Sequence, residues 1–103
     1  MKYKMIQTEN KPELTVLKKG EAFKILQVRG NITMFMPKHI STKEAIITVM
    51  EGSAILDING TEHLLNAHDC FIIPAKQEHT LLIMTKFRAL VTMPVESNIE
   101  FTN

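Results

Sequence analysis

The dipeptide Asn59-Gly60 is the local feature that most constrains how this chain can fold. It stands between Asp57-Ile58 and Thr61-Glu62, at the junction of two short β-prone runs. Asn and Gly both tolerate the positive φ angles of a type I′ turn, whose twist matches that of a two-residue hairpin. The sequence therefore predicts two antiparallel strands that meet at this turn.

Other turn signals recur about every 8 to 12 residues, the spacing typical of a sandwich or barrel of short antiparallel strands. No segment keeps the apolar period of a helix for the eleven or so residues that would favour one. We expect Pro37 to end a strand or to lie at a sheet edge. The expected strands are 14–17, 23–28, 32–36, 46–50, 54–58, 61–65, 71–73, 79–84 and 87–93, with a short one near 3–6. The sequence therefore predicts an all-β domain.

The bulk properties exclude several classes of function. A chain of 103 residues builds one core, and we divide it into an N-terminal arm (1–20), a barrel (21–95) and a C-terminal tail (96–103). A formal charge of +1 gives no reason to expect nucleic acid or a membrane as partner.

No apolar run has the length of a signal peptide or a membrane span, so we expect a cytoplasmic protein. No nucleotide cofactor is expected, and Cys70, at the start of an apolar run, is expected to be buried.

Two histidines and one carboxylate stand near the ends of predicted strands. His39 and Ser41 share a strand face, because successive side chains alternate between faces. Glu44 begins the next strand, and His79 begins a later one. If the three side chains meet in a cavity, they form the two-histidine, one-carboxylate set that suits iron(II) and also accepts manganese, nickel or zinc.

The same faces predict the lining of a pocket. If the face of Glu44 is the barrel interior, Thr48 and Met50 lie on it beneath the carboxylate. Leu81 and Ile83 share the face of His79. The predicted pocket residues are Phe35, Ser41, Thr48, Met50, Leu81 and Ile83.

From about residue 30 to residue 93 the sequence resembles the cupin superfamily, and its small single-domain members in particular. His39, Glu44 and Gly52 are similar to the first cupin motif, in which two histidines precede a glutamate and a glycine closes the strand. Pro74 and His79 are similar to the second motif. The resemblance implies a double-stranded β-helix (jelly-roll) barrel with a central ligand pocket and, commonly, a divalent metal.

Four positions depart from the cupin pattern. Ser41 stands where the second histidine is expected, and a serine hydroxyl is a poor metal ligand. Lys76 and His68 replace glycines of the pattern, and Ile83 replaces an asparagine. Histidine tolerates positive φ better than most residues, so the turn at His68 remains feasible. The motifs that shape the fold are retained, whereas the metal-ligand set is reduced.

Three functions remain open at this level. The chain is either a small-molecule-binding barrel, a metal-dependent enzyme of the dioxygenase or isomerase type, or a metal-free sensor or interaction barrel. The resemblance also implies a homodimer in which N-terminal strands cross onto the partner's sheet, for which residues 1–20 are the candidate. Because one barrel hosts many unrelated chemistries, neither catalysis nor a substrate follows from the fold.

Overall fold

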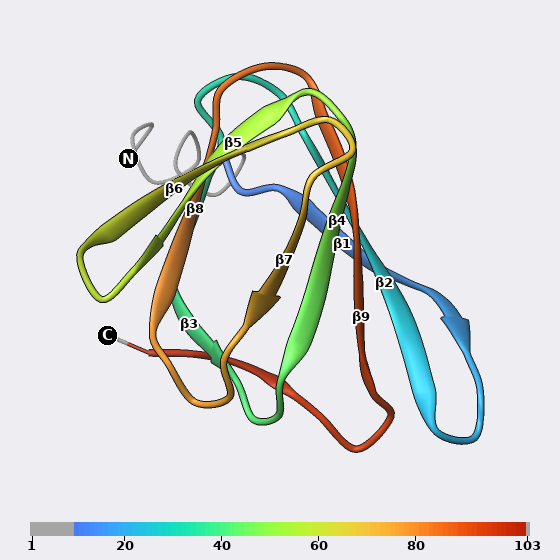
Figure 1. Cartoon of the computed structure of the whole chain (residues 1–103). Coiled ribbons are helices and arrows are strands. Elements are labelled where there is room, and N and C mark those ends of the chain that lie inside the picture. Colours follow the sequence, from blue (N-terminus) through green and yellow to red (C-terminus); the bar gives the residue numbers. More distant parts are fainter. Residues whose placement is uncertain (1–9, 103) are drawn as a thin grey trace, which may run out of the picture.

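A computed structural model describes residues 10–102, which form ten β-strands (Figure 1). The expected strand near residues 3–6 lies outside the described residues. None of the residues that the structure describes belongs to a helix long and apolar enough to cross a membrane. The strands are β1 (Glu13–Lys19), β2 (Phe23–Gly30), β3 (Phe35–Ser41), β4 (Ala45–Glu51), β5 (Ser53–Ile58), β6 (Thr61–Asn66), β7 (Cys70–Ile73), β8 (His79–Ile83), β9 (Phe87–Pro94) and β10 (Ile99–Phe101).

The strands form two five-stranded antiparallel sheets that face each other around the core (Figure 1). One sheet has the order β1-β2-β9-β4-β7 and is called the β9 sheet after its central strand. The other has the order β10-β3-β8-β5-β6 and is called the β8 sheet. Strands far apart in the chain pair within each sheet, as in a jelly roll, and the all-β barrel predicted from the sequence is confirmed.

The hairpin between β5 and β6 has the predicted turn. Asn59 and Gly60 both have positive φ angles, 52° and 87°, as a type I′ turn requires. The backbone N–H of Gly60 donates to Oδ1 of Asp57 at 2.9 Å. The turn fixes the register from Ile58↔Thr61 to Ser53↔Asn66, and with it the face on which each side chain of the two strands lies.

The face of β4 that points into the core differs from the expectation. Ala45, Ile47 and Val49 are buried, whereas Glu44 and Met50 are exposed. Because side chains alternate along a strand, a shift of one residue moves every side chain to the other face. The expectation that Glu44, Thr48 and Met50 point inward is therefore wrong.

A second correction concerns β3, which spans residues 35–41 and contains Pro37 instead of ending at it. The register against β8 shifts between Met36, opposite Leu81, and His39, opposite His79. Pro37 and Lys38 on β3 thus lie opposite the single residue Thr80 on β8, which is a β-bulge, and proline is tolerated at bulges. As a result Met36 and His39 both point inward, and Phe35 points outward with 42% of its surface exposed.

The two ends of the described chain are held in the sheets. β1 pairs with β2 of the same chain at one edge of the β9 sheet, and β10 pairs with β3 beside His39 and Ser41. The predicted tail thus contributes a strand to the barrel. Cys70 is exposed at the edge strand β7, which corrects the expectation that it is buried.

Candidate functional site

His39 is carried into the barrel by the bulge in β3. Its side chain is 5% exposed, and its Nδ1–H donates to the carbonyl oxygen of Pro37 at 2.6 Å. A carbonyl only accepts hydrogen bonds, so Nδ1 carries the proton, and in a neutral ring Nε2 is then an acceptor. Phe101 of β10 packs against the same ring, with centroids 5.4 Å apart. The orientation of His39 is thus fixed by its own strand and by β10.

His79 is the first residue of β8 and lies directly opposite His39 in the register. The two imidazole rings meet edge to face, with centroids 4.1 Å apart and an interplanar angle of 61°. Nδ1–H of His79 donates to the carbonyl oxygen of Gln77 at 2.9 Å. The arrangement repeats that of His39, so each ring holds its proton on Nδ1 and presents Nε2 as an acceptor.

Burial lowers the pKa of both histidines. The pKa of His39 falls from 6.5 to about 4, mainly because burial penalises the charged ring, and secondarily because a charged His79 would repel it. The hydrogen bond to Pro37 opposes this shift. The pKa of His79 is lowered by the same desolvation. Both rings are therefore neutral at pH 7, in agreement with their close approach.

The two rings line a cavity of about 40 Å³ between the sheets, room for about three water molecules. Ser41 is the third polar side chain of the lining, and its hydroxyl donates to the carbonyl oxygen of Lys43 at 2.7 Å. Everything else in the lining is apolar: Leu14, Val28, Met36, Ala45, Ile47, Leu56, Ile73, Leu81, Val91 and Ile99. The cavity is thus an apolar space whose lining includes two neutral imidazole rings.

The structure brings together some of the predicted site residues and separates others. His39, His79, Ser41 and Leu81 line the cavity. Ile83 is buried further along β8 and does not reach it. The remaining predicted residues, Phe35, Glu44, Thr48 and Met50, lie on outward faces.

The set of residues in the cavity does not fit a metal centre with three protein ligands. Glu44, to which the cupin resemblance assigned the carboxylate ligand, is exposed, and the methyl group of Ala45 takes the inward position. Within residues 10–102 no three His, Cys, Asp or Glu side chains are grouped so that they would hold a metal ion. Two imidazoles fall short of the three protein ligands of catalytic zinc or of the iron facial triad.

Sequence reasoning missed most of the apolar lining, and the missed signal was in the alternation of β4. The set Ala45, Ile47, Val49 is apolar throughout, whereas the alternative set mixes Glu44 and Thr48 with apolar residues. A uniformly apolar face belongs inside a barrel. The contributions of Leu14 and Ile99 had no local signal, because each depends on how an end of the chain packs.

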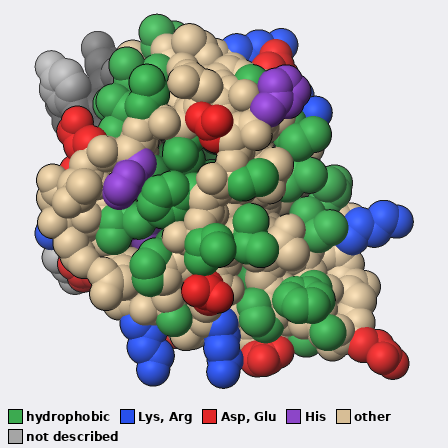
Figure 2. Space-filling view, in the orientation of Figure 1, with side chains coloured by type: hydrophobic (Ala, Val, Ile, Leu, Met, Phe, Trp, Pro, Cys, Tyr) green, Lys and Arg blue, Asp and Glu red, His purple; other side chains and the backbone are tan. Residues whose placement is uncertain are grey.

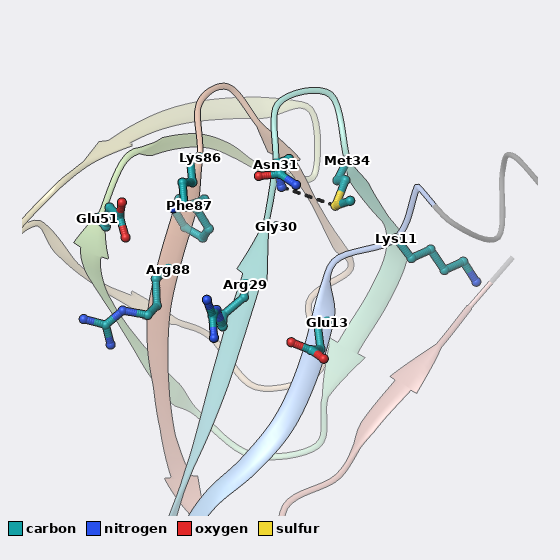
Figure 3. Close-up of a pocket in the computed structure, with 10 residues that line it drawn as sticks. All are labelled: Lys11, Glu13, Arg29, Gly30, Asn31, Met34, Glu51, Lys86, Phe87 and Arg88. Atoms are coloured by element: carbon teal, nitrogen blue, oxygen red, sulfur yellow. Dashed lines mark hydrogen bonds between the residues drawn. The ribbon is translucent and has the colours of Figure 1, made fainter.

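A larger hollow of about 370 Å³ lies at the other end of the barrel, around Gly30 and Phe87 (Figure 3). Its charged lining residues are Lys11, Glu13, Arg29, Glu51, Lys86 and Arg88. Most of these side chains are exposed, and they carry both signs of charge. This hollow is therefore a solvated part of the surface, and the buried histidine cavity is the candidate site.

Comparisons with known proteins agree with the fold. A protein-family model described as a cupin domain matches residues 33–93. An uncharacterised conserved protein with a double-stranded β-helix domain from Klebsiella pneumoniae superposes with a TM-score of 0.79 at 18% identity, over 90% of this chain and 85% of that one. None of the curated proteins matches the chain.

Two further similar structures are those of proteins that carry individual names. The DMSP lyase DddQ from Ruegeria pomeroyi has a TM-score of 0.80 at 19% identity, over 89% of this chain and 52% of that one. KdgF from Halomonas sp. has a TM-score of 0.73 at 13% identity, over 81% and 77% of the two chains. At such low identities the likeness concerns the fold alone.

Proposed function

Because the chain belongs to the cupin family, we propose that it binds a small, uncharged organic molecule in the cavity of His39 and His79. The molecule has an apolar body and a hydrogen-bond donor, such as a hydroxyl group. The observation that carries the proposal is the pair of imidazoles whose Nδ1–H groups are both held by backbone carbonyls. This leaves two acceptors, and no charge, on the wall of an apolar cavity.

The chemistry of the wall selects the class of ligand. A buried acceptor is stabilised when a donor reaches it, and a hydroxyl or N–H group of a ligand supplies that donor. An anion would lose its hydration without gaining a positive partner, because both rings are neutral at pH 7 and no lining residue is a lysine or arginine. A cation would find no carboxylate in the lining. A neutral ligand is the class that this wall favours.

The test is a titration followed through the methyl resonances of Ile47 and Leu81. Ethanol and propanol serve as neutral donors, and acetate and propionate serve as anions of matched chain length, because the cavity of about 40 Å³ admits only molecules of this size. We expect saturable shifts with the two alcohols and none with the two anions at pH 7. The variants His39→Phe and His79→Phe lose the response, whereas His63→Phe, outside the cavity lining, keeps it.

The metal-dependent alternative is tested on the same samples by elemental analysis of protein purified without chelators. Near-stoichiometric iron, manganese, nickel or zinc in the wild type, lost in His79→Phe and needed for ligand binding, would overturn the proposal. Binding of the anions in preference to the alcohols would overturn it as well.

We also propose that the protein works in the cytoplasm. The single cysteine, Cys70, is a free and exposed thiol. Reducing compartments keep such thiols intact, whereas proteins of oxidising compartments more often carry paired cysteines.

A further inference from the structure

A small molecule can reach the histidine cavity only by a path between the two sheets. The strands of each sheet are hydrogen-bonded to their neighbours. Hydrophobic side chains also gather on the outward face of the β9 sheet, over β7, β4, β9 and β2 (Figure 2). A ligand therefore does not pass through a sheet, and it has to enter at an edge or at an end of the barrel.

The exposure of the lining shows where the cavity wall is thinnest. Of the described residues that line the cavity, Leu14 and Ile99 alone are partly exposed, and all the others are buried. Leu14 belongs to β1 and Ile99 to β10, which are edge strands of different sheets. β1 pairs with β2, and β10 pairs with β3. The seam between β1 and β10 is therefore closed by side chains.

The other approaches to the cavity are closed more firmly. At the opposite edge His63 of β6 packs on Phe71 of β7, with ring centroids 4.7 Å apart. The far end of the barrel is filled by Phe87, and the hollow around it shares no lining residue with the cavity. His79 borders a further surface hollow of about 270 Å³, but its ring is 5% exposed and is held by the carbonyl oxygen of Gln77.

Of the two strands at the seam, β10 is held by fewer contacts. β1 has seven residues and pairs with β2 at six positions, whereas β10 has three residues and pairs with β3 at three. In Figure 1 the red segment that contains β10 crosses the lower end of the barrel beside β3. Segments with few contacts open locally at a lower free-energy cost. β10 is therefore the part of the wall that opens first.

The chain just before β10 is firmly anchored. Ser97 is fully buried, its Oγ accepts a bond from the backbone N–H of Lys43 at 3.2 Å, and its carbonyl oxygen accepts one from Nζ of Lys24 at 2.7 Å. The backbone N–H of Asn98 donates to Oγ1 of Thr42 at 2.9 Å. These bonds fix the start of β10 and give it a hinge.

The side-chain contacts beyond this hinge are weaker. The ring of Phe101 is 56% exposed. It packs on the ring of His39, with centroids 5.4 Å apart, and Nζ of Lys11 lies 5.6 Å from its centroid. A cation–π contact at an exposed site contributes little to stability. The part of β10 around Phe101 can thus separate from β3 while Ser97 stays in place.

We infer that β10 is a gate, hinged at Ser97, through which ligands enter and leave the histidine cavity. In the closed state Ile99 forms part of the wall and limits the size of the molecule that fits. In the open state Ile99 and Phe101 move away from Ser41 and His39, which lie opposite them on β3. The identity of the ligand, a small neutral molecule, rests on the proposed function, whereas the gate itself follows from the contacts of β10.

The first test measures opening without any ligand, by the acylation of histidine rings in the full chain with diethyl pyrocarbonate, located by mass spectrometry. The reporter is His79, which is 5% exposed and does not contact Phe101, and exposed His68 is the internal reference. Phe101→Ala is expected to raise the rate at His79 about fivefold relative to His68, because it removes an aromatic contact that holds β10 closed. Phe23→Ala on β2, where the ring is 59% exposed, is the matched control and leaves the rate unchanged.

The second test locks the gate. Ile40 and Glu100 lie directly opposite each other on β3 and β10, and neither lines the cavity. The Cα atoms of such a pair are about 5 Å apart, within the range of a disulfide. In a Cys70→Ser background, the double variant Ile40→Cys and Glu100→Cys is expected to react at His79 at least about tenfold more slowly when oxidised than after reduction. The reduced protein is its own control.

The dependence on urea separates opening of the gate from global unfolding. Local opening exposes little surface, so the rate at His79 should change little with urea below the unfolding transition. A rate that follows the full urea dependence of unfolding would overturn the inference. Equal rates in Phe101→Ala and Phe23→Ala, or a disulfide that leaves the rate unchanged, would overturn it as well. Since no ligand is present, these results judge the gate independently of whether the alcohols bind.

Discussion

His39 and His79 show how two ordinary titrating side chains become neutral acceptors. Each ring is 5% exposed and holds its proton on Nδ1 through a bond to a nearby backbone carbonyl. A charge on either ring would have to be buried beside the other ring, 4.1 Å away between centroids. The hydrogen bonds select the tautomer, and burial selects the charge state.

This state makes folding stability depend on pH. In the unfolded chain His39 takes up a proton near pH 6.5, whereas in the fold it does so at about 4. Between these values the unfolded state binds more protons, so stability falls as the pH is lowered and is complete only above about 6.5. The loss from His39 amounts to about 3 kcal/mol, and His79 adds to it in the same direction.

The measurement is the free energy of unfolding in urea at several pH values between 4 and 7. The difference between wild type and His39→Phe isolates this residue from the carboxyl groups, which titrate in both. We expect the unfolding free energy of the wild type to fall relative to that of His39→Phe as the pH is lowered. A difference independent of pH would contradict the neutral buried state of His39.

Two glycines with similar backbone angles should respond differently to alanine. Gly52 has φ +82°, and an added Cβ would lie 1.9 Å from the carbonyl oxygen of Lys86. Gly60 has φ +87° and nothing within 4 Å of the added atom. Gly60→Ala thus suffers only the strain of the left-handed region, about 1 to 2 kcal/mol, whereas Gly52→Ala must also displace backbone.

We therefore expect Gly52→Ala to cost more than about 3 kcal/mol in unfolding free energy. Thermal or urea denaturation of the two variants side by side gives the comparison. Equal losses at the two sites would mean that the close approach between Gly52 and Lys86 is absent in solution.

For the strand β4, the presence and extent of the element were predicted correctly, whereas its inward face was not. Its existence and extent were predictable from the β-prone residues between two turn signals. Its inward face was assigned wrongly, because Ile46 and Met50 on one face are large and apolar like Ile47 on the other, although Ala45, Ile47 and Val49 form the uniformly apolar set. The bulge in β3 had the same effect, since one extra residue at Pro37 moved Phe35 outward and Met36 inward.

The orientation of β4 is tested by a pair of neighbouring substitutions. Glu44→Ala removes an exposed carboxylate and should change the unfolding free energy by less than about 0.5 kcal/mol. Ala45→Glu places a carboxylate in the apolar cavity and should cost at least about 3 kcal/mol at pH 7. Denaturant unfolding of both variants measures the difference. The opposite order of effects would restore the original expectation for Glu44.

The barrel as a whole was the most predictable level. Regular turn signals, an absent helical period and the Asn59-Gly60 hairpin all point to the same architecture. The site was less predictable, because it depends on a one-residue register shift and on two chain ends that fold over the cavity. The histidines were found because they stand near the ends of predicted strands, at positions that resemble the cupin motifs, whereas Leu14 and Ile99 carry no such signal.

The sheet order predicts how local stability is distributed. β8 is paired on both sides, with β3 and β5, whereas β10 and β6 lie at the edges of the same sheet. Amides of β8 should therefore exchange with solvent only on nearly global unfolding, and those of the two edge strands by local opening. Hydrogen exchange followed by mass spectrometry or NMR gives the order. Equal protection in β8 and β10 would contradict the two-sheet arrangement.

The proposed function depends on two neutral histidines that act as hydrogen-bond acceptors in the cavity. Its most direct test is nitrogen NMR of the imidazole rings at pH 7, with His39 and His79 assigned by the two phenylalanine variants. Both rings are expected to be neutral with the proton on Nδ1, and propanol is expected to move the Nε2 resonances. A protonated ring at pH 7, a proton on Nε2, or an Nε2 bound to metal in the purified protein would contradict it.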